Sequence, residues 1–327
     1  MSDIVLRPAQ VRVPGSTANL GTGFDVLGLA LDRYVTASYT PGPAPLHLER
    51  GGTLAGLDVP QEQDTFVRAF RARLAEHGAM DAGGVLECAS EIPLSRGMGS
   101  SAAAVVAALT LADAAVGASP QPGAPRSADA RPDAARQEAL AWAVEWEGHP
   151  DNAAPSIFGG LVAVARDAAG RAVAFPLPLS ERLGFAWAAP GVELDTPTAR
   201  RALPKEVPHA LATRAVGRVT ALVRGLATGD PELIRIGFAD ELHVPYRLPL
   251  IPGGKAVLEA ATGAGAWAAT ISGSGTGLIA ICPRELTATV AEAMRAAFRA
   301  EVKEPGDVAF PVLPDLDGAR VLETAHS

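Results

Sequence analysis

One stretch decides the fold: Pro93-Leu94-Ser95-Arg96-Gly97-Met98-Gly99-Ser100-Ser101-Ala102-Ala103. An apolar strand precedes this glycine- and serine-rich loop, and an alanine-rich helix begins directly after it. Glycines let backbone N–H groups face one point, and a helix N-terminus adds partial positive charge there. Serine hydroxyls donate hydrogen bonds and also ligate Mg²⁺. The stretch therefore predicts a loop that holds an oligophosphate, with Ser100 or Ser101 as an ordinary helix N-cap the alternative.

Two better-known phosphate loops are absent. No GxxxxGK[ST] stretch exists, and none of Lys205, Lys255 and Lys303 follows such a loop. GxGxxG, the dinucleotide fingerprint, is missing as well. We therefore expect the helix dipole, the backbone and a metal ion to hold the phosphates without a loop lysine.

Two further glycine-rich segments stand at either end of the chain. The first, residues 13–28 (VPGSTANLGTGFDVLG), places Asn19 and Asp25 just after a strand. An amide and a carboxylate there suit an amine or hydroxyl of a small ligand, although a turn residue and an N-cap would look the same. The other, residues 271–277 (ISGSGTG), lies between two apolar strands and is a weak signal alone.

Composition excludes several classes of protein. A net charge of −8 argues against a nucleic-acid partner, which needs a basic surface. Only Cys88 and Cys282 are present, which indicates neither a disulfide framework nor a zinc site and suits a reducing cytosol. The sequence contains no apolar run of about 20 residues, so it predicts no membrane span. The first residues lack the apolar core of a signal peptide. We expect a cytoplasmic protein.

The periodicity alternates strands and helices without a fixed repeat. Residues 117–132 are rich in Pro, Ala and Ser and read as a loop insertion. We expect strands at 11–13, 85–88, 161–165, 268–271 and 278–281, and helices at 66–77, from 101, at 133–147, 197–203 and 209–228. The first strand is expected to end at Pro14-Gly15.

Together the three glycine-rich segments resemble the GHMP kinases, whose loop reads Pro-x-x-x-Gly-Leu-Gly-Ser-Ser-Ala; Met98 stands at the Leu position. The resemblance implies an α+β, two-domain fold. Its N-terminal half, 1–168, would be a nucleotide-binding α/β domain like ribosomal protein S5. Its C-terminal half, 169–327, would be a ferredoxin-like α+β domain. The whole loop, Pro93 to Ala103, would bind ATP.

Four other segments resemble the homoserine kinases within that superfamily. They are PGSTANLGTGFDVLG from Pro14, EGHPDNAAP from Glu147, DTPTAR from Asp195 and VPYR from Val244. The resemblance implies ATP-dependent phosphorylation of the L-homoserine hydroxyl to O-phospho-L-homoserine, in threonine biosynthesis. A GHMP kinase for another small alcohol and a non-catalytic ligand sensor of this fold remain alternatives. The resemblance also leads us to expect a homodimer.

Carried over residue by residue, the resemblance implies a homoserine pocket made of Asn19, Asp25, His149, Asn152, Thr196, Arg200 and Arg247. Asn19, Asn152 and Arg200 would also take part in catalysis. The chemistry agrees, because an amino acid needs an anion, Asp25, for its ammonium. Two arginines offer forked donors for its carboxylate.

Mg²⁺ would bind Ser101 and Glu145, with Glu147 the competing glutamate. No catalytic base is apparent: mevalonate-type relatives carry aspartate where Asn152 stands, and an amide takes no proton. The implied mechanism is in-line attack on the γ-phosphate, with a phosphate oxygen or water accepting the proton. At the adenine site, Asp64 replaces the asparagine that is common in relatives, which puts a side-chain contact with adenine in doubt.

Overall fold

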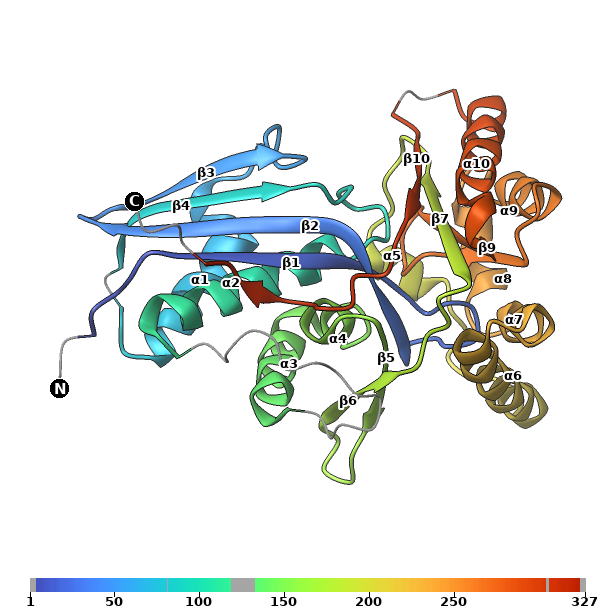
Figure 1. The fold of residues 1–327 in the computed structure, drawn as a ribbon, viewed down its shortest axis with the longest axis horizontal. Helices are drawn as coiled ribbons and strands as arrows, with labels where there is room; N and C mark the ends of the chain where they lie inside the picture. Colours follow the sequence, from blue (N-terminus) through green and yellow to red (C-terminus); the bar gives the residue numbers. More distant parts are fainter. Residues whose placement is uncertain (1–3, 81, 119–132, 304–305, 324–327) are drawn as a thin grey trace.

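The chain forms two β-sheets joined side by side, each carrying helices (Figure 1). A computed structural model describes residues 4–80, 82–118, 133–303 and 306–323. The expected insertion at 117–132 lies outside the described residues except at 117 and 118. No helix in the described ranges is long and apolar enough to cross a membrane.

The larger sheet has seven strands in the order β11-β1-β2-β4-β3, with β5 and β6 branching from β2. Its strands are β1 (Ala9–Ala18), β2 (Leu27–Gly42), β3 (Leu46–Gly52), β4 (Gly83–Ser90), β5 (Leu161–Arg166), β6 (Ala172–Leu177) and β11 (Arg320–Val321). β2 is long enough to pair with β5 through its first residues and with β4 through its last. Among the described strand pairs of this sheet, only β3–β4 is parallel.

Four helices cover one face of this sheet (Figure 1). They are α1 (Thr65–Glu76), α2 (Ser100–Val116), α3 (Ala134–Glu147) and α4 (Ala153–Phe158). α2 is the central one: most of its Ala, Val and Leu side chains are fully buried against β1, β2 and the neighbouring helices. Small side chains let these elements approach closely, so the N-terminus of α2 is held rigidly at the edge of the sheet.

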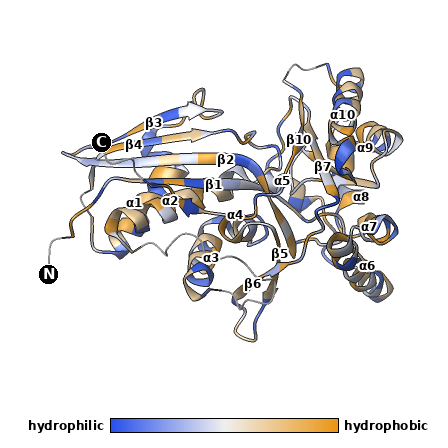
Figure 2. Ribbon diagram, viewed as in Figure 1, coloured by the Kyte–Doolittle hydropathy of each residue, from blue (hydrophilic) through white to orange (hydrophobic). Residues whose placement is uncertain are grey.

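The smaller sheet is antiparallel, in the order β10-β7-β9-β8. Its strands are β7 (Leu183–Ala189), β8 (Ala268–Ile271), β9 (Leu278–Pro283) and β10 (Val308–Val312). The helices are α5 (Thr196–Arg201), α6 (His209–Thr228), α7 (Pro231–Phe238), α8 (Val244–Arg247), α9 (Gly254–Gly263) and α10 (Thr287–Glu301). The order β-α-β-β-α-β is that of a ferredoxin-like domain, as expected. Outer helices such as α10 carry both hydrophobic and hydrophilic residues (Figure 2).

The expected strands and helices are largely confirmed, since α6 spans 209–228 and α1, α2 and α3 begin within a residue of the expected positions. The prediction that the first strand ends at Pro14-Gly15 was wrong. β1 continues to Ala18, and a shift of register between Pro14 and Gly15 absorbs the proline. The division after residue 168 stays a prediction; pairing of β6 with β5 favours a boundary beyond residue 177.

Candidate active site

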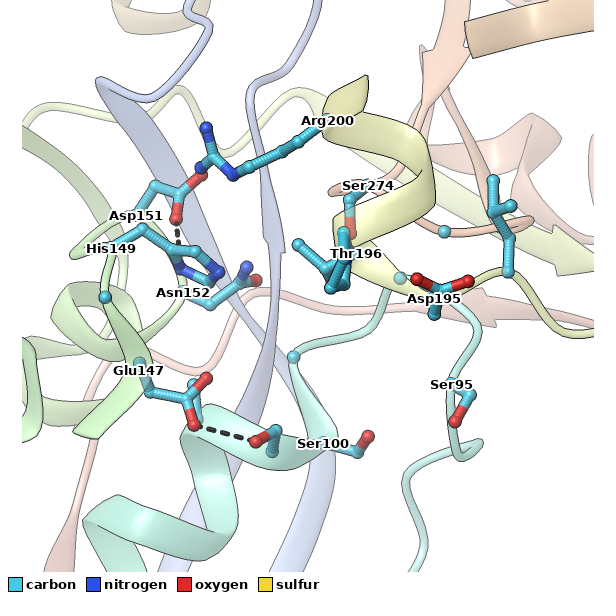
Figure 3. Close-up of a pocket in the computed structure, with 18 of the residues that line it drawn as sticks. Ser95, Ser100, Glu147, His149, Asp151, Asn152, Asp195, Thr196, Arg200 and Ser274 are labelled. Atoms are coloured by element: carbon cyan, nitrogen blue, oxygen red, sulfur yellow. Dashed lines mark hydrogen bonds and ion pairs between the residues drawn. The ribbon is translucent and has the colours of Figure 1, made fainter. Parts of the chain in front are cut away.

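A cavity of about 770 Å³ opens where α2, α3 and α4 meet α5 and the loops of the smaller sheet (Figure 3). Its walls include Asn19, Asp25, Ser95, Gly97, Gly99, Ser100, Ser101, Ala102, Glu147, His149, Asp151, Asn152, Asp195, Thr196, Arg200, Arg247 and Ser274. The seven residues expected to surround the substrate therefore lie in one cavity, together with six of the expected phosphate loop.

The phosphate loop presents an uncapped helix N-terminus to this cavity. Gly97 and Gly99 have φ values of 77° and 65°, which glycine adopts without strain. Gly99 is the N-cap of α2, and no side chain caps the helix there. Neither Ser100 nor Ser101 is therefore the N-cap, and the first N–H groups of α2 remain available for an anion.

The rest of the expected loop lies elsewhere. Met98 and Ala103 are fully buried in the core, where they anchor the loop. Arg96 turns away and donates to the carbonyl of Gly306 at 2.8 Å. Pro93 is not in the wall of the main cavity, and Leu94 lines a second cavity described below.

The three glycine-rich segments meet at the loop. Ser272 Oγ donates to the carbonyl of Gly97 at 2.6 Å, and it lies 2.9 Å from Thr17 Oγ1, whose hydroxyl can donate to it. Asn19 Nδ2 donates to the carbonyl of Gly273 at 2.8 Å. The third segment, weak as a sequence signal, thus joins the first segment to the phosphate loop.

Asn19 and Asp25 occupy a tight turn between β1 and β2. Both have positive φ, 75° and 55°, and Asn19 Oδ1 accepts a hydrogen bond from the Asp25 N–H at 2.9 Å. The Asp25 carboxylate receives both terminal nitrogens of Arg200, at 3.0 and 3.1 Å. These hydrogen bonds raise the pKa of Arg200. Asp25 and Arg200 were both expected in the pocket, and the structure shows that they also form an ion pair with each other.

Arg247 is the second cation of the cavity, and its surroundings are unusual. The residue is 1% exposed, its guanidinium lies 5.1 Å from the Phe24 ring centre, and Nε donates to the Ala199 carbonyl at 3.3 Å. No carboxylate in the described ranges lies within ion-pair distance. Burial, aided by the nearby charge of Arg200, lowers its pKa. A buried cation without an anion is a site prepared for an anionic ligand.

Glu147, and not Glu145, faces the cavity. Ser101 Oγ donates to Glu147 Oε1 at 2.7 Å, and burial raises the pKa of Glu147. Glu145 is exposed and is not in the wall of the cavity. Residues two apart on a helix point to nearly opposite sides, so only one glutamate of this pair can reach Ser101. The geometry therefore favours Glu147 over the expected Glu145 as the partner of Ser101, and the metal ligand itself stays a prediction.

Asp151 is a cavity residue that sequence reasoning missed. It is buried, and its Oδ1 lies 3.2 Å from His149 Nδ1, which raises the pKa of His149 (Figure 3). Next to it, Asn152 Oδ1 accepts from Ser16 Oγ at 3.0 Å. The available signal was a carboxylate two residues after a histidine at the start of a helix.

A second cavity, of about 360 Å³, adjoins the first and shares Ser95, Ser100 and Ser101 with it. Its other walls are mostly apolar: Leu48, Leu54, Leu57, Val59, Phe66, Cys88, Leu94 and Ala104, with Arg50, Gln63, Asp64 and Thr65. Asp64 pairs with Arg50 at 2.7 Å and caps α1 through the Phe66 and Val67 N–H groups. Both tasks occupy its carboxylate, which agrees with the doubt about a contact with adenine.

Comparison with known proteins identifies close relatives. The family model for the GHMP kinases N terminal domain matches residues 64–160, and that for the GHMP kinases C terminal matches residues 222–300. Homoserine kinase from Moorella thermoacetica is 40% identical, over 88% of this chain and 92% of its own. Homoserine kinase from Prochlorococcus marinus (strain MIT 9303) is 37% identical over 89% of both chains. The crystal structure of homoserine kinase from Cytophaga hutchinsonii superimposes with a TM-score of 0.81, at 29% identity, over 96% of this chain and 97% of its own.

His243 packs against the turn that contains Asn19 and Asp25. Its ring is completely buried, stacks on Phe24 at 5.1 Å and approaches the Gly21 carbonyl at 3.1 Å through Nε2. Burial lowers its pKa, although Asp240, 3.8 Å away, opposes this effect. The folded protein therefore holds His243 neutral.

Stability should fall in mild acid because of His243. Below its unfolded pKa of about 6.5, the unfolded chain binds a proton that the fold excludes, so acidification favours unfolding. Between pH 7.5 and 5.5 this costs up to about 1.4 kcal/mol. Urea unfolding at both pH values measures it, and His243→Asn should reduce the difference. The exposed His47→Asn serves as control; an unchanged difference in His243→Asn would contradict the assignment.

Proposed function

The chain belongs to the homoserine kinase family of the GHMP kinases, and we propose that it phosphorylates homoserine by direct in-line transfer from ATP, without a carboxylate base. One observation carries the proposal: the buried Arg247, which has no ion pair in the described ranges, lies in the same cavity as the uncapped N-terminus of α2. The cavity thus offers a carboxylate site and a phosphate site together. Similarity to homoserine kinases does not favour the alternatives of another small alcohol or a ligand sensor.

Homoserine would lie between the two sheets. Its carboxylate would meet Arg247 and Arg200, whose forked donors match a carboxylate. Its ammonium would meet Asp25. Thr196, His149 and Asn19 complete the wall of the cavity. The hydroxyl would then point toward Asn152 and the phosphate loop, which line the same cavity.

ATP would occupy both cavities. The phosphates suit the N-terminus of α2 and the left-handed glycines, because free N–H groups and the helix dipole favour negative charge. The second, largely apolar cavity adjoins that loop and has room for the nucleoside. The shared walls at Ser95, Ser100 and Ser101 would separate the nucleoside from the reacting phosphate.

Mg²⁺ would bind Glu147 and Ser101. These oxygens lie 2.7 Å apart, and the desolvated carboxylate makes no ion pair within the described residues, so the pair fits a hard divalent ion. Mg²⁺ typically takes one or two carboxylates together with substrate phosphates, which agrees with a single glutamate here. When bound, it would neutralise charge on the phosphates during transfer.

The carboxylates that line the cavity all have other partners. Asp25 pairs with Arg200, Glu147 with Ser101 and Asp151 with His149, whereas Asp195 caps α5. Asn152 offers an amide, which accepts no proton. Positioning and electrostatic stabilisation would therefore supply most of the rate, and a phosphate oxygen or water would take the proton.

We further propose that the protein acts in the cytoplasm as a homodimer, with neither a nucleic acid nor a membrane as partner. Both cysteines are free and buried, which suits a reducing compartment. Net charge of −8 disfavours nucleic acid. Sedimentation of the purified protein would measure the oligomeric state.

A substrate panel tests the function. Purified protein with ATP and Mg²⁺ should release ADP with L-homoserine and yield O-phospho-L-homoserine, detectable by phosphorus NMR. Mevalonate, galactose and shikimate should be inert, because none carries both an ammonium and a carboxylate. Turnover of one of these with homoserine inert would overturn the proposal.

Arg247→Met should weaken homoserine binding strongly without loss of fold. Removing a buried charged partner of the carboxylate costs roughly 2–5 kcal/mol, so the homoserine KM should rise about 30-fold or more. Methionine keeps the aliphatic packing and removes an unpaired buried charge, so the apo-protein should be no less stable. Arg224→Ala, on the exposed side of α6, is the control. A normal homoserine KM in Arg247→Met would place the carboxylate elsewhere.

Glu147→Gln and Glu145→Gln form a matched pair for the metal site. Glu147→Gln removes the only charged ligand that we assign, so the Mg²⁺ concentration for half-maximal activity should rise about tenfold or more. Glu145→Gln, two residues away and exposed, should behave as wild type. Titration of Mn²⁺ binding by electron paramagnetic resonance gives a readout independent of turnover. The opposite pattern would restore Glu145 as the ligand.

A further inference from the structure

The Asp25–Arg200 ion pair connects the two halves of the molecule across the cavity. Asp25 lies in the turn between β1 and β2 of the larger sheet, and Arg200 lies in the last turn of α5, beyond β7. Both carboxylate oxygens and both terminal nitrogens take part, at 3.0 and 3.1 Å. Their side chains are 37% and 38% exposed, so a ligand in the cavity can reach them.

Each partner is also the group that one charge of an amino acid would need. An ammonium requires Asp25, and a carboxylate gains from Arg200. Neither is free while the two are paired, whereas Arg247 has no carboxylate partner in the described part of the chain. A ligand that uses Asp25 or Arg200 must therefore compete with the ion pair, whereas a ligand that uses Arg247 alone does not.

We infer that the Asp25–Arg200 ion pair is a charge gate that selects zwitterions over alcohols with a single charge. The inference rests on the proposed function and concerns how the site rejects near relatives of homoserine. A zwitterion replaces one internal ion pair by two external ones, so no charge is left alone. An anion gives Arg200 a partner but leaves the Asp25 carboxylate without one. A cation gives Asp25 a partner but leaves the Arg200 guanidinium without one.

Arg247 makes the gate directional. Because it is buried and not paired, it can receive a carboxylate whether the gate is open or closed. A simple hydroxy acid would bind there while Arg200 stays with Asp25, and so would gain one arginine instead of two. Homoserine would bring its ammonium to Asp25, which releases Arg200 to join Arg247 on the carboxylate.

The gate makes an unusual prediction: a variant that damages homoserine use should improve use of a singly charged analogue. The test measures kcat/KM for L-homoserine, 4-hydroxybutyrate (no ammonium) and 3-amino-1-propanol (no carboxylate). Asp25→Asn releases Arg200, so 4-hydroxybutyrate should improve by about fivefold, the equivalent of one half-exposed ion pair. Arg200→Gln releases Asp25 and should improve 3-amino-1-propanol similarly.

Two controls separate the gate from general electrostatics. Asp195→Asn removes the same formal charge from the wall of the cavity, but it leaves the ion pair of Arg200 intact. Asparagine also preserves the cap of α5. It should leave the ratio of 4-hydroxybutyrate to homoserine use unchanged. The double variant Asp25→Asn/Arg200→Gln should lose the gain in 4-hydroxybutyrate, since that gain requires the released arginine.

The outcomes are distinct. Gains that occur in the single variants and vanish in the double variant support the gate. If Asp25→Asn only loses homoserine and gains nothing with 4-hydroxybutyrate, or if Asp195→Asn gains equally, the gate is wrong while the kinase function stands. If wild type does not use homoserine at all, the proposed function itself fails.

Discussion

The close approach of two backbones, at Gly97 and the Ser272–Gly277 turn, is the constraint on which the site depends. A Cβ at Gly97 would lie 2.1 Å from the Ser272 carbonyl oxygen, and one at Gly277 would lie 2.1 Å from the Arg96 carbonyl. Only glycine fits at such distances. This contact places the smaller sheet against the N-terminus of α2, so the proposed phosphate site and the proposed substrate site share one cavity. Larger side chains there would separate the two sheets and both sites with them.

The cavity keeps charges in states that the fold alone would not favour. Arg247 is buried without a carboxylate partner, and burial raises the pKa of Glu147 above its ordinary value. Each costs the empty protein stability, because a charge removed from water needs a partner. Stability lost in this way is recovered when an anion meets Arg247 and a cation meets Glu147. The missing partner of each group therefore predicts the charge of its ligand, which is an anion at Arg247 and a cation at Glu147.

Local patterns predicted many of the residues that line the cavity, whereas the geometry between distant segments could not be predicted from them. Gly97 and Gly99 could be recognised because a strand, a glycine loop and a helix follow one another in sequence. The choice between Glu145 and Glu147 depended on the rotation of α3 relative to Ser101, which the spacing of one helix does not determine. β1 continues past Pro14 because the register shift is made by its partner β2, a long-range pairing that is invisible locally. The role of Ser272 was equally hidden, since its partners Gly97 and Thr17 are distant in the chain.

Sequence reasoning placed Asp25 and Arg200 correctly in the cavity but did not foresee that they pair with each other. The reason is general. A site that binds a zwitterion must itself carry both charges, and two opposite charges that are close enough to hold one small ligand are close enough to meet without it. Without a ligand, the two charges of such a site pair with each other. A bound zwitterion replaces this internal ion pair by two ion pairs with the ligand. Arg247 differs because it contacts Phe24 and the Ala199 carbonyl and makes no ion pair in the described part of the chain. In the proposed binding mode, this asymmetry would let Arg247 anchor the substrate while Arg200 responds to the charge of the ligand.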